Sequence, residues 1–262
     1  MTQKKRVVVK VGTSTLTYDT GKINIRRIEL LSQVLSDLNH SGCEVVLVSS
    51  GAVGVGMGKL GLTKRPDTIR GKQAASAVGQ SELMSMYEKF FAEYGCQVAQ
   101  VLLTKNVLVE EPLRVNAQNA FRTLLDWHVV PIVNENDVIS TAELEFGDND
   151  TLSAVVAELI GADMLIILSD IDGLFDKDPG KYDDAKLVPV VTEITDELMG
   201  TAGDAGSNRG TGGMVTKLIA AKKVMSAGAD MVITNGNDPK AIYDILENKP
   251  VGTKFIANRN GE

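Results

Sequence analysis

The chain has 262 residues, of which 44% are hydrophobic and 23% are charged, and its net charge at pH 7 is −7. This composition is typical of a globular protein with enough apolar residues for a sizeable core, and the negative charge argues against nucleic acid or an anionic membrane as partner. The sequence has no apolar run of signal-peptide or membrane-spanning length, so we expect a cytoplasmic protein.

Short apolar runs alternate with segments of helical periodicity along the whole chain. In chain order the pattern predicts a strand at 6–11, a helix within 23–42, a strand at 44–48, a helix at about 69–94, a strand at 97–103, a helix near 116–127, a strand at 129–133, a helix at 151–161, a strand at 163–170, a helix at 214–228 and a strand at 230–234. Residues 138–146 partly alternate and predict a hairpin or flap, whereas 171–189 predict a turn-rich excursion.

Continuous apolar strands separated by helices predict an α/β protein with a mainly parallel sheet covered on both faces. Nothing in the sequence resembles a linker or a repeat, so we expect a single domain over residues 1–262. Ligands of such sheets bind beyond the carboxyl ends of the strands. Functional residues are therefore expected directly after each apolar run.

Lys10 lies in the first predicted strand, just before Gly12. A lysine in a buried strand either reaches solvent at the strand end or meets a negative partner. The second alternative predicts a fixed cation for phosphate, with Gly12 allowing the backbone to approach it.

A glycine-rich segment, 49–61, follows the second predicted strand. Its Gly56-x-Gly58-x-x-Gly61 spacing matches a dinucleotide fingerprint, but it lies too far beyond the strand for one, so we expect no nicotinamide cofactor. Backbone N–H groups at a strand-to-helix turn suit an anion, which singles out Ser50, Gly51 and Ala52. We interpret the stretch from Gly54 to Gly61 as a tight turn.

Acids and asparagines gather in two later loops, 134–137 and 147–151. Asp150 could cap a helix that starts at Thr151, orient a lysine, or do both. Asp137 and Asp148 could be solvated turn residues. Alternatively, the two loops could form a pocket that binds an ammonium group through its acids and a carboxylate through its asparagines.

The stretch GTGGMVTK, residues 210–217, precedes a helical pattern and places Lys217 one turn inside the helix. It could be only a glycine hinge, but a helix N-terminus also offers free N–H groups and a positive dipole end to phosphate. On spacing alone, Ser169 and Asp170 belong to an ordinary Asp-Gly turn; the alternative is contact with a ribose or base.

Together these motifs resemble the amino acid kinase family, and within it the enzymes that phosphorylate glutamate at the start of proline biosynthesis. The matching segments are VVVKVGTS, SSGAVGVG, VVPIVNENDVISTAE, FGDNDTLSA, LSDIDGLFDKDP and GTGGMVTK, in this order. The resemblance implies a three-layer αβα sandwich around an open, mainly parallel sheet. It also implies ATP-dependent phosphorylation of the glutamate γ-carboxylate. That carboxylate is already ionised at pH 7, so no general base is needed, and a chain with only two histidines suffices.

The resemblance also implies a role for each motif residue. The catalytic residues would be Lys10 and Lys217, which neutralise the transferring phosphoryl group, and Asp150, which holds both. The glutamate-binding residues would be Ser50, Gly51, Ala52, Asn134, Asp137, Asp148 and Asn149. The ATP-binding residues would be Lys10, Gly12, Ser169, Asp170, Thr211, Gly212, Gly213, Met214 and Lys217.

Mg²⁺ would be held largely by the ATP phosphates, so no dedicated metal ligands are expected. The resemblance further implies feedback inhibition by proline and a homo-oligomer, either a dimer or a tetramer. Many relatives of this kind continue into a C-terminal PUA domain, and we expect a short form that lacks it. The alternatives are another acyl kinase, for aspartate or N-acetylglutamate, and a non-catalytic amino-acid or nucleotide sensor on the same fold.

Overall fold

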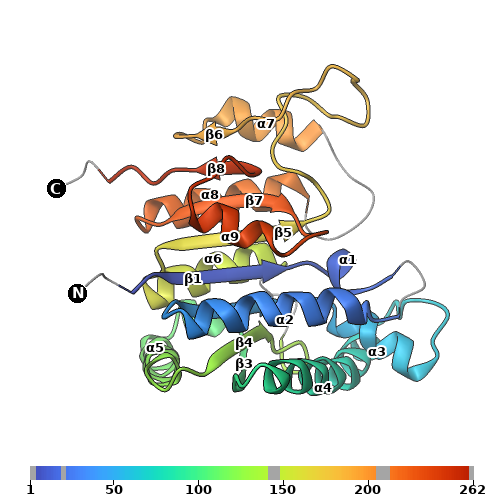
Figure 1. Cartoon of the computed structure of the whole chain (residues 1–262). Coiled ribbons are helices and arrows are strands. Elements are labelled where there is room, and N and C mark those ends of the chain that lie inside the picture. The colour runs from blue at the N-terminus through green and yellow to red at the C-terminus, as the bar shows by residue number, and fades with distance from the viewer. Residues whose placement is uncertain (1–3, 19–21, 141–147, 205–212, 260–262) are drawn as a thin grey trace.

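The computed structural model describes residues 4–18, 22–140, 148–204 and 213–259. Its strands form one sheet in the order β3-β4-β2-β1-β5-β7-β8-β6 (Figure 1). Each pairs with its neighbours in parallel, except that β7 and β8 are antiparallel. The strands are β1 Arg6–Val11, β2 Glu44–Ser49, β3 Val98–Leu103, β4 Val130–Glu135, β5 Met164–Ser169, β6 Val190–Val191, β7 Asp230–Asn235 and β8 Thr253–Phe255.

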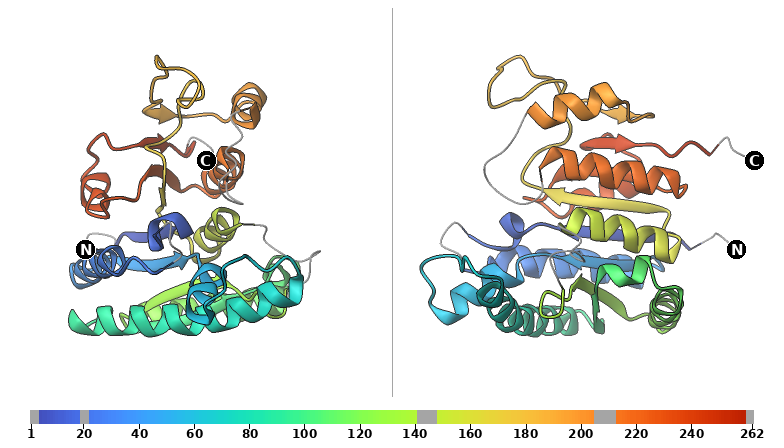
Figure 2. Two further views of the ribbon diagram at one scale, coloured as in Figure 1. Left: turned by 90° about the vertical axis from the view of Figure 1, so that its right-hand side faces the viewer. Right: turned by 180° about the vertical axis from the view of Figure 1, so that it is seen from behind.

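Helices cover both faces of this sheet, as the two turned views in Figure 2 show. One core lies between the sheet and helices α5, α6 and α8, and the other lies between the sheet and α2, α3, α4 and α9. The fold is therefore the predicted three-layer αβα sandwich. The helices are α1 Thr13–Leu16, α2 Ile25–His40, α3 Ala52–Leu60, α4 Ile69–Glu93, the 3₁₀ helix η1 Lys105–Leu108, α5 Glu111–Asp126, α6 Asn149–Ile160, α7 Asp196–Asp204, α8 Met214–Ser226 and α9 Ala241–Leu246.

The alternation of side chains along β1 decides which layer the site faces. Val8 packs into the core under α6 and α8, whereas Val7 and Val9 pack into the opposite core. Because successive side chains of a strand point to opposite faces, Lys10 lies on the same face as Val8. Its ammonium group is thereby directed towards α6 and α8.

The predicted strands and long helices are all present, with ends shifted by a few residues. The largest shift is in α5, which begins at Glu111 rather than near 116 and carries a proline in its first turn, where proline is tolerated. The turn-rich excursion over 171–189 is also confirmed, with one isolated bridge between Phe175 and Leu187. Most of the predicted hairpin or flap, from 141 to 146, lies outside the described residues.

The interpretation of Gly54 to Gly61 as a tight turn is wrong, because α3 spans Ala52–Leu60. Gly56 of this helix serves helix packing instead, together with Gly79 of α4. A Cβ at Gly56 would lie 1.8 Å from the carbonyl oxygen of Ala75, and a Cβ at Gly79 would lie 1.8 Å from that of Ala52. The backbones of α3 and α4 thus approach too closely for any side chain at these two positions.

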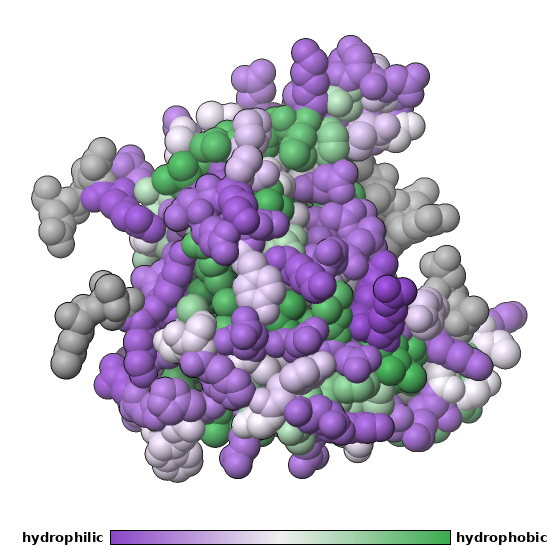
Figure 3. All heavy atoms as spheres, viewed as in Figure 1, coloured by the Kyte–Doolittle hydropathy of each residue, from purple (hydrophilic) through white to green (hydrophobic). Residues whose placement is uncertain are grey.

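Polar side chains cover most of the face seen in Figure 3, with apolar residues visible between them. None of the helices in the described ranges has the length and apolar character that crossing a bilayer requires.

Candidate active site

Two buried lysines share one buried carboxylate at the carboxyl end of β1. The Nζ atom of Lys10 lies 2.6 Å from Oδ1 of Asp150, and that of Lys217 lies 3.1 Å from Oδ2. Lys10 is only 7% exposed, Asp150 0% and Lys217 4%. Two ammonium groups thus face one carboxylate in a site that water barely reaches. Such a cluster is suited to bind an anion.

The fold brings these residues together from three distant segments. Lys10 is the next-to-last residue of β1, Asp150 is the second residue of α6, and Lys217 is the fourth residue of α8. Burial raises the pKa of Asp150, but the charges of Lys10 and Lys217 outweigh that effect and hold it below its ordinary value. Asp150 is therefore ionised at neutral pH.

Helix α6 is capped by Asp148, so the alternative that Asp150 caps this helix is wrong. Oδ1 of Asp148 accepts a hydrogen bond of 2.8 Å from the backbone N–H of Thr151. Asp150 lies inside the first turn, where its side chain is free to meet the lysines. Burial of Asp148 raises its pKa, and the nearby charge of Asp150 adds to the increase. Asp148 is half-buried, so the alternative of a solvated turn residue is also wrong for it.

Three of the residues expected to bind glutamate form one hydrogen-bond network. The side-chain amide of Asn149 donates to Oγ of Ser50 and to Oδ1 of Asn134, both at 2.9 Å. Asp137 accepts a hydrogen bond from Ser76 on α4 and lines a groove beside that helix. Loops after β2 and β4 and the start of α6 thus meet, as strand-end loops of a parallel sheet are expected to do.

One of the predicted backbone donors is not available for an anion, because the N–H of Ser50 donates to the carbonyl oxygen of Val11 at 3.1 Å. The other predicted donors lie at two short turns beside this network. Gly51 caps α3 with a φ of 97°, a left-handed conformation that favours glycine, and Ala52 is the first residue of the helix. Gly12 caps α1, and a Cβ there would lie 3.8 Å from the Nζ atom of Lys10. The helix start at Gly12 thus lies near Lys10, whereas the helix start at Gly51 directly follows Ser50, a member of the hydrogen-bond network.

The residues expected to bind ATP occupy the neighbouring strand end and the start of α8. Ser169 donates a hydrogen bond of 3.1 Å to Asp170, and both line a cavity of about 320 Å³ together with Thr15. Gly213 caps α8 without a side-chain hydrogen bond, and Met214 is the first residue of the helix. Thr211 and Gly212 lie outside the described residues.

Three polar residues of the site escaped the sequence reasoning. Thr216 stands next to Lys217 in the quoted motif, and its hydroxyl lies 3.1 Å from Oδ2 of Asp150 and 2.8 Å from the carbonyl oxygen of Gly213. Ser76 and Gln80 reach the 134–137 loop from α4. These two have no motif around them, and only their spacing of four residues on a helix could have pointed to a shared face.

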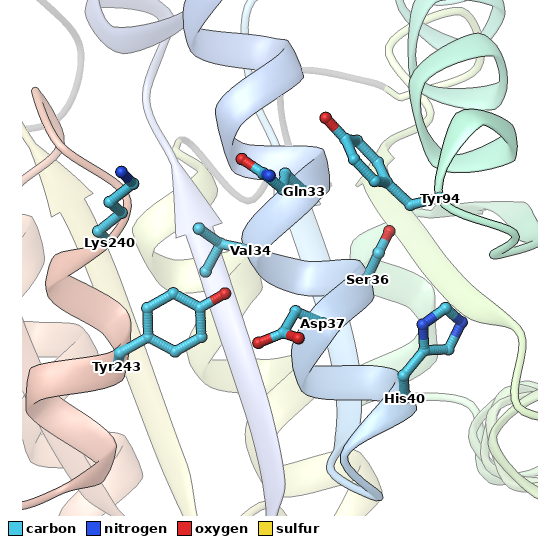
Figure 4. A pocket seen from close by; sticks show the side chains of 8 residues that line it. All are labelled: Gln33, Val34, Ser36, Asp37, His40, Tyr94, Lys240 and Tyr243. Atoms are coloured by element: carbon cyan, nitrogen blue, oxygen red, sulfur yellow. The ribbon is translucent and has the colours of Figure 1, made fainter.

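A further pocket, of about 390 Å³, lies between α2 and α9 and is drawn in Figure 4. None of the predicted site residues lines it. Its Asp37 is hydrogen-bonded to the hydroxyl of Tyr243; burial, followed by this contact, raises the pKa of that tyrosine to about 12. Nothing in this pocket resembles the lysine cluster, so the candidate active site is the one at the end of β1.

Comparison with known proteins gives consistent results. The amino acid kinase family matches residues 5–235 of this chain. The chain is 58% identical over 259 residues to the glutamate 5-kinase of Clostridium perfringens, covering 97% of this chain and 96% of that one. It is 51% identical to the glutamate 5-kinase of Lactococcus lactis, covering 96% and 94%. A longer relative, the glutamate 5-kinase of Caldanaerobacter subterraneus, is 49% identical, and the match spans 68% of its length.

Solved structures with lower identity share the fold. The carbamate kinase from Giardia lamblia bound to AMP-PNP has a TM-score of 0.68 at 18% identity, covering 98% of this chain and all of that one. The isopentenyl phosphate kinase of T. acidophilum, in a product complex, has a TM-score of 0.66 at 20% identity, covering 96% of this chain and all of that one.

Proposed function

The chain belongs to the amino acid kinase family, and on that basis we propose that it transfers the γ-phosphoryl group of ATP to the γ-carboxylate of glutamate, the first step of proline biosynthesis. The product is glutamyl 5-phosphate, an acyl phosphate. The observation that carries the proposal is the buried trio of Lys10, Asp150 and Lys217 at 2.6 and 3.1 Å. The names of relatives up to 58% identical supply the substrate.

The trio supplies what phosphoryl transfer requires. During transfer, negative charge on the phosphoryl oxygens needs preorganised positive groups rather than a base. Lys10 and Lys217 approach Asp150 from different layers, so their ammonium groups flank the space beside it. Asp150 fixes both side chains and leaves an excess positive charge for the phosphoryl group. The attacking γ-carboxylate is ionised at pH 7 and needs no proton acceptor.

Glutamate would bind across the loops that follow β2 and β4. Asn134 and Asn149 provide amides for its α-carboxylate, whereas Asp137 and Asp148 provide carboxylates for its ammonium group. Ser50 and the N–H groups of Gly51 and Ala52 complete the proposed pocket. An acidic pocket of this kind favours a free amino acid over an N-acetylated one, which lacks the ammonium charge.

ATP would lie over the neighbouring strand end. Its phosphates would reach Lys10, Lys217, Gly12 and the start of α8 from Gly213, and its ribose or base would reach Ser169 and Asp170. Thr211, Gly212 and Met214 are proposed to complete this site. Mg²⁺ bound to the phosphates would neutralise part of their charge. No group of three or more His, Cys, Asp or Glu residues that could hold a metal ion gathers within the described parts of the chain.

We further propose a single catalytic domain, because the one continuous sheet carries both proposed binding sites. Inhibition by proline, a homo-oligomeric assembly and a cytoplasmic location are proposed from the family resemblance alone.

An acyl-hydroxamate assay tests the function. Purified protein is incubated with ATP, Mg²⁺ and hydroxylamine, and with glutamate, aspartate or N-acetylglutamate. We expect hydroxamate with glutamate only. Equal or greater product with either of the others would refute the substrate, and binding of glutamate and ATP without ADP formation would point to a sensor.

A further inference from the structure

Helix α4 contacts both ends of the 134–137 loop, which we propose to bind glutamate. Ser76 donates a hydrogen bond to Asp137, and Oε1 of Gln80 accepts one of 2.9 Å from Nδ2 of Asn134. Ser76 is 3% exposed and Gln80 is half-buried. Being four residues apart, the two lie on one face of the helix. The helix therefore presents one donor and one acceptor to the loop.

The orientation of the Asn134 amide is set by its surroundings. The backbone N–H of Glu135 and Nδ2 of Asn149 both donate to Oδ1 of Asn134, each at 2.9 Å. A backbone N–H can only donate, so this end of the amide is the oxygen, and its two lone pairs are used. The NH₂ end consequently faces Gln80, which takes one of its two hydrogens. One N–H of Asn134 is left for a ligand.

The amide of Asn149 is oriented in the same manner. Its Nδ2 also lies 2.9 Å from the backbone carbonyl oxygen of Ser49, which can only accept, so the two hydrogens of Asn149 are shared among three acceptors. A directed chain of hydrogen bonds thus runs from Asn149 through Asn134 to Gln80. The far part of α4 is fixed as well, because the hydroxyl of the buried Tyr87 lies 2.9 Å from Oγ of Ser49. Gln80 is the final acceptor of the chain.

We infer that Gln80 is a positioning residue for the glutamate pocket: it holds the NH₂ group of Asn134 so that the remaining N–H faces the substrate carboxylate. The inference rests on the proposed function. Gln80 acts through Asn134 and needs no contact with glutamate. Without its acceptor, the Asn134 side chain would lose a partner at its nitrogen and could rotate about its terminal torsion, which is intrinsically soft.

The variant Gln80→Met tests this inference, because methionine is of similar length, forms helices as well as glutamine and lacks the acceptor. Losing one neutral hydrogen bond should raise the KM for glutamate about 5- to 10-fold, with kcat and the KM for ATP within about twofold of wild type. In an Asn134→Ala background the same change should leave the KM for glutamate within about twofold of that of Asn134→Ala alone, because the amide through which Gln80 acts is absent.

Gln33→Met is the matched control, since Gln33 is an exposed glutamine on α2, remote from the site. It should leave all three kinetic constants and the melting temperature unchanged. If the melting temperature of Gln80→Met lies below that of wild type, Gln80→Ala is measured in the same way.

Two results would overturn the inference. One is an unchanged KM for glutamate in Gln80→Met. The other is an equal rise of that KM with and without Asn134→Ala, because Gln80 would then act on glutamate directly. An inactive wild-type protein would refute the proposed function, whereas an active wild type with an unaffected Gln80→Met would refute only the role of Gln80.

Discussion

Replacing Asp150 by asparagine should destabilise the protein strongly. The carboxylate is fully buried and ion-paired at 2.6 Å to Lys10 and 3.1 Å to Lys217, whose side chains are only 9% and 5% exposed. Asp150→Asn keeps the shape and removes the charge, so two buried ammonium groups lose their counter-ion. Removing one partner of a buried ion pair costs about 3–5 kcal/mol. In a protein of this size 1 kcal/mol moves the melting temperature by about 2–4 °C, so we expect a fall of about 6–20 °C.

Thermal unfolding followed by circular dichroism measures this effect, first without nucleotide and then with ATP and Mg²⁺. Because the ATP phosphates would replace the missing negative charge, ATP should raise the melting temperature of Asp150→Asn more than that of wild type. Asp126→Asn, at an exposed position at the end of α5, is the matched control and should melt like wild type. A melting temperature of Asp150→Asn within about 2 °C of wild type would refute the claim that the lysines depend on this carboxylate.

The pH dependence of the difference follows from the lowered pKa of Asp150. A carboxyl group with a lowered folded-state pKa contributes its full stability above the unfolded value of about 3.9, and loses it as the pH falls through the folded value. The difference in melting temperature between wild type and Asp150→Asn should therefore stay constant from about pH 8 to pH 5.

Three further predictions follow from the same geometry. Lys217→Ala should lower kcat about 10²–10³-fold. It should cost less stability than Asp150→Asn, because Asp150 keeps its ion pair with Lys10. Near wild-type turnover would contradict the catalytic role of Lys217. Asp148→Asn keeps a helix cap and removes a carboxyl group whose pKa is raised by burial, so at pH 7 the melting temperature of the variant should equal or exceed that of wild type. Its KM for glutamate should rise about 10-fold or more. An unchanged KM would exclude Asp148 from the pocket. Gly79→Ala would place a Cβ 1.8 Å from a backbone oxygen of α3 and should cost about 3 kcal/mol; an unchanged midpoint of urea unfolding would contradict the close contact of α3 and α4.

Much of the fold could be predicted from the sequence because periodicity records burial. The apolar runs at 6–11 and 163–170 are strands with both faces covered, and nothing local competes with that pattern. The order of the strands in the sheet could not be predicted in this way, since an apolar run does not specify which other strand it pairs with. The sequence also placed Lys10, Asp150 and Lys217 in separate motifs, without showing that the ammonium groups of both lysines lie within about 3 Å of the Asp150 carboxylate.

The errors have tertiary causes. Gly54 to Gly61 suggested a turn because glycine is a poor helix former, yet close packing against α4 requires glycine at position 56. Asp148 and Asp150 are both able to cap a helix, and only the positions of the lysines show that Asp150 is the one buried in the ion pairs. Gln80 has no motif around it, and its helical spacing from Ser76 does not identify its partner, which is 54 residues away.

A crystal structure with glutamate, Mg²⁺ and a non-hydrolysable ATP analogue tests the central claim most directly. We expect oxygens of the γ-phosphoryl group within about 3 Å of Nζ of both Lys10 and Lys217, with the γ-carboxylate of glutamate facing the phosphorus atom. A γ-phosphoryl group bound away from both lysines, with Asp150 still pairing them, would contradict the account.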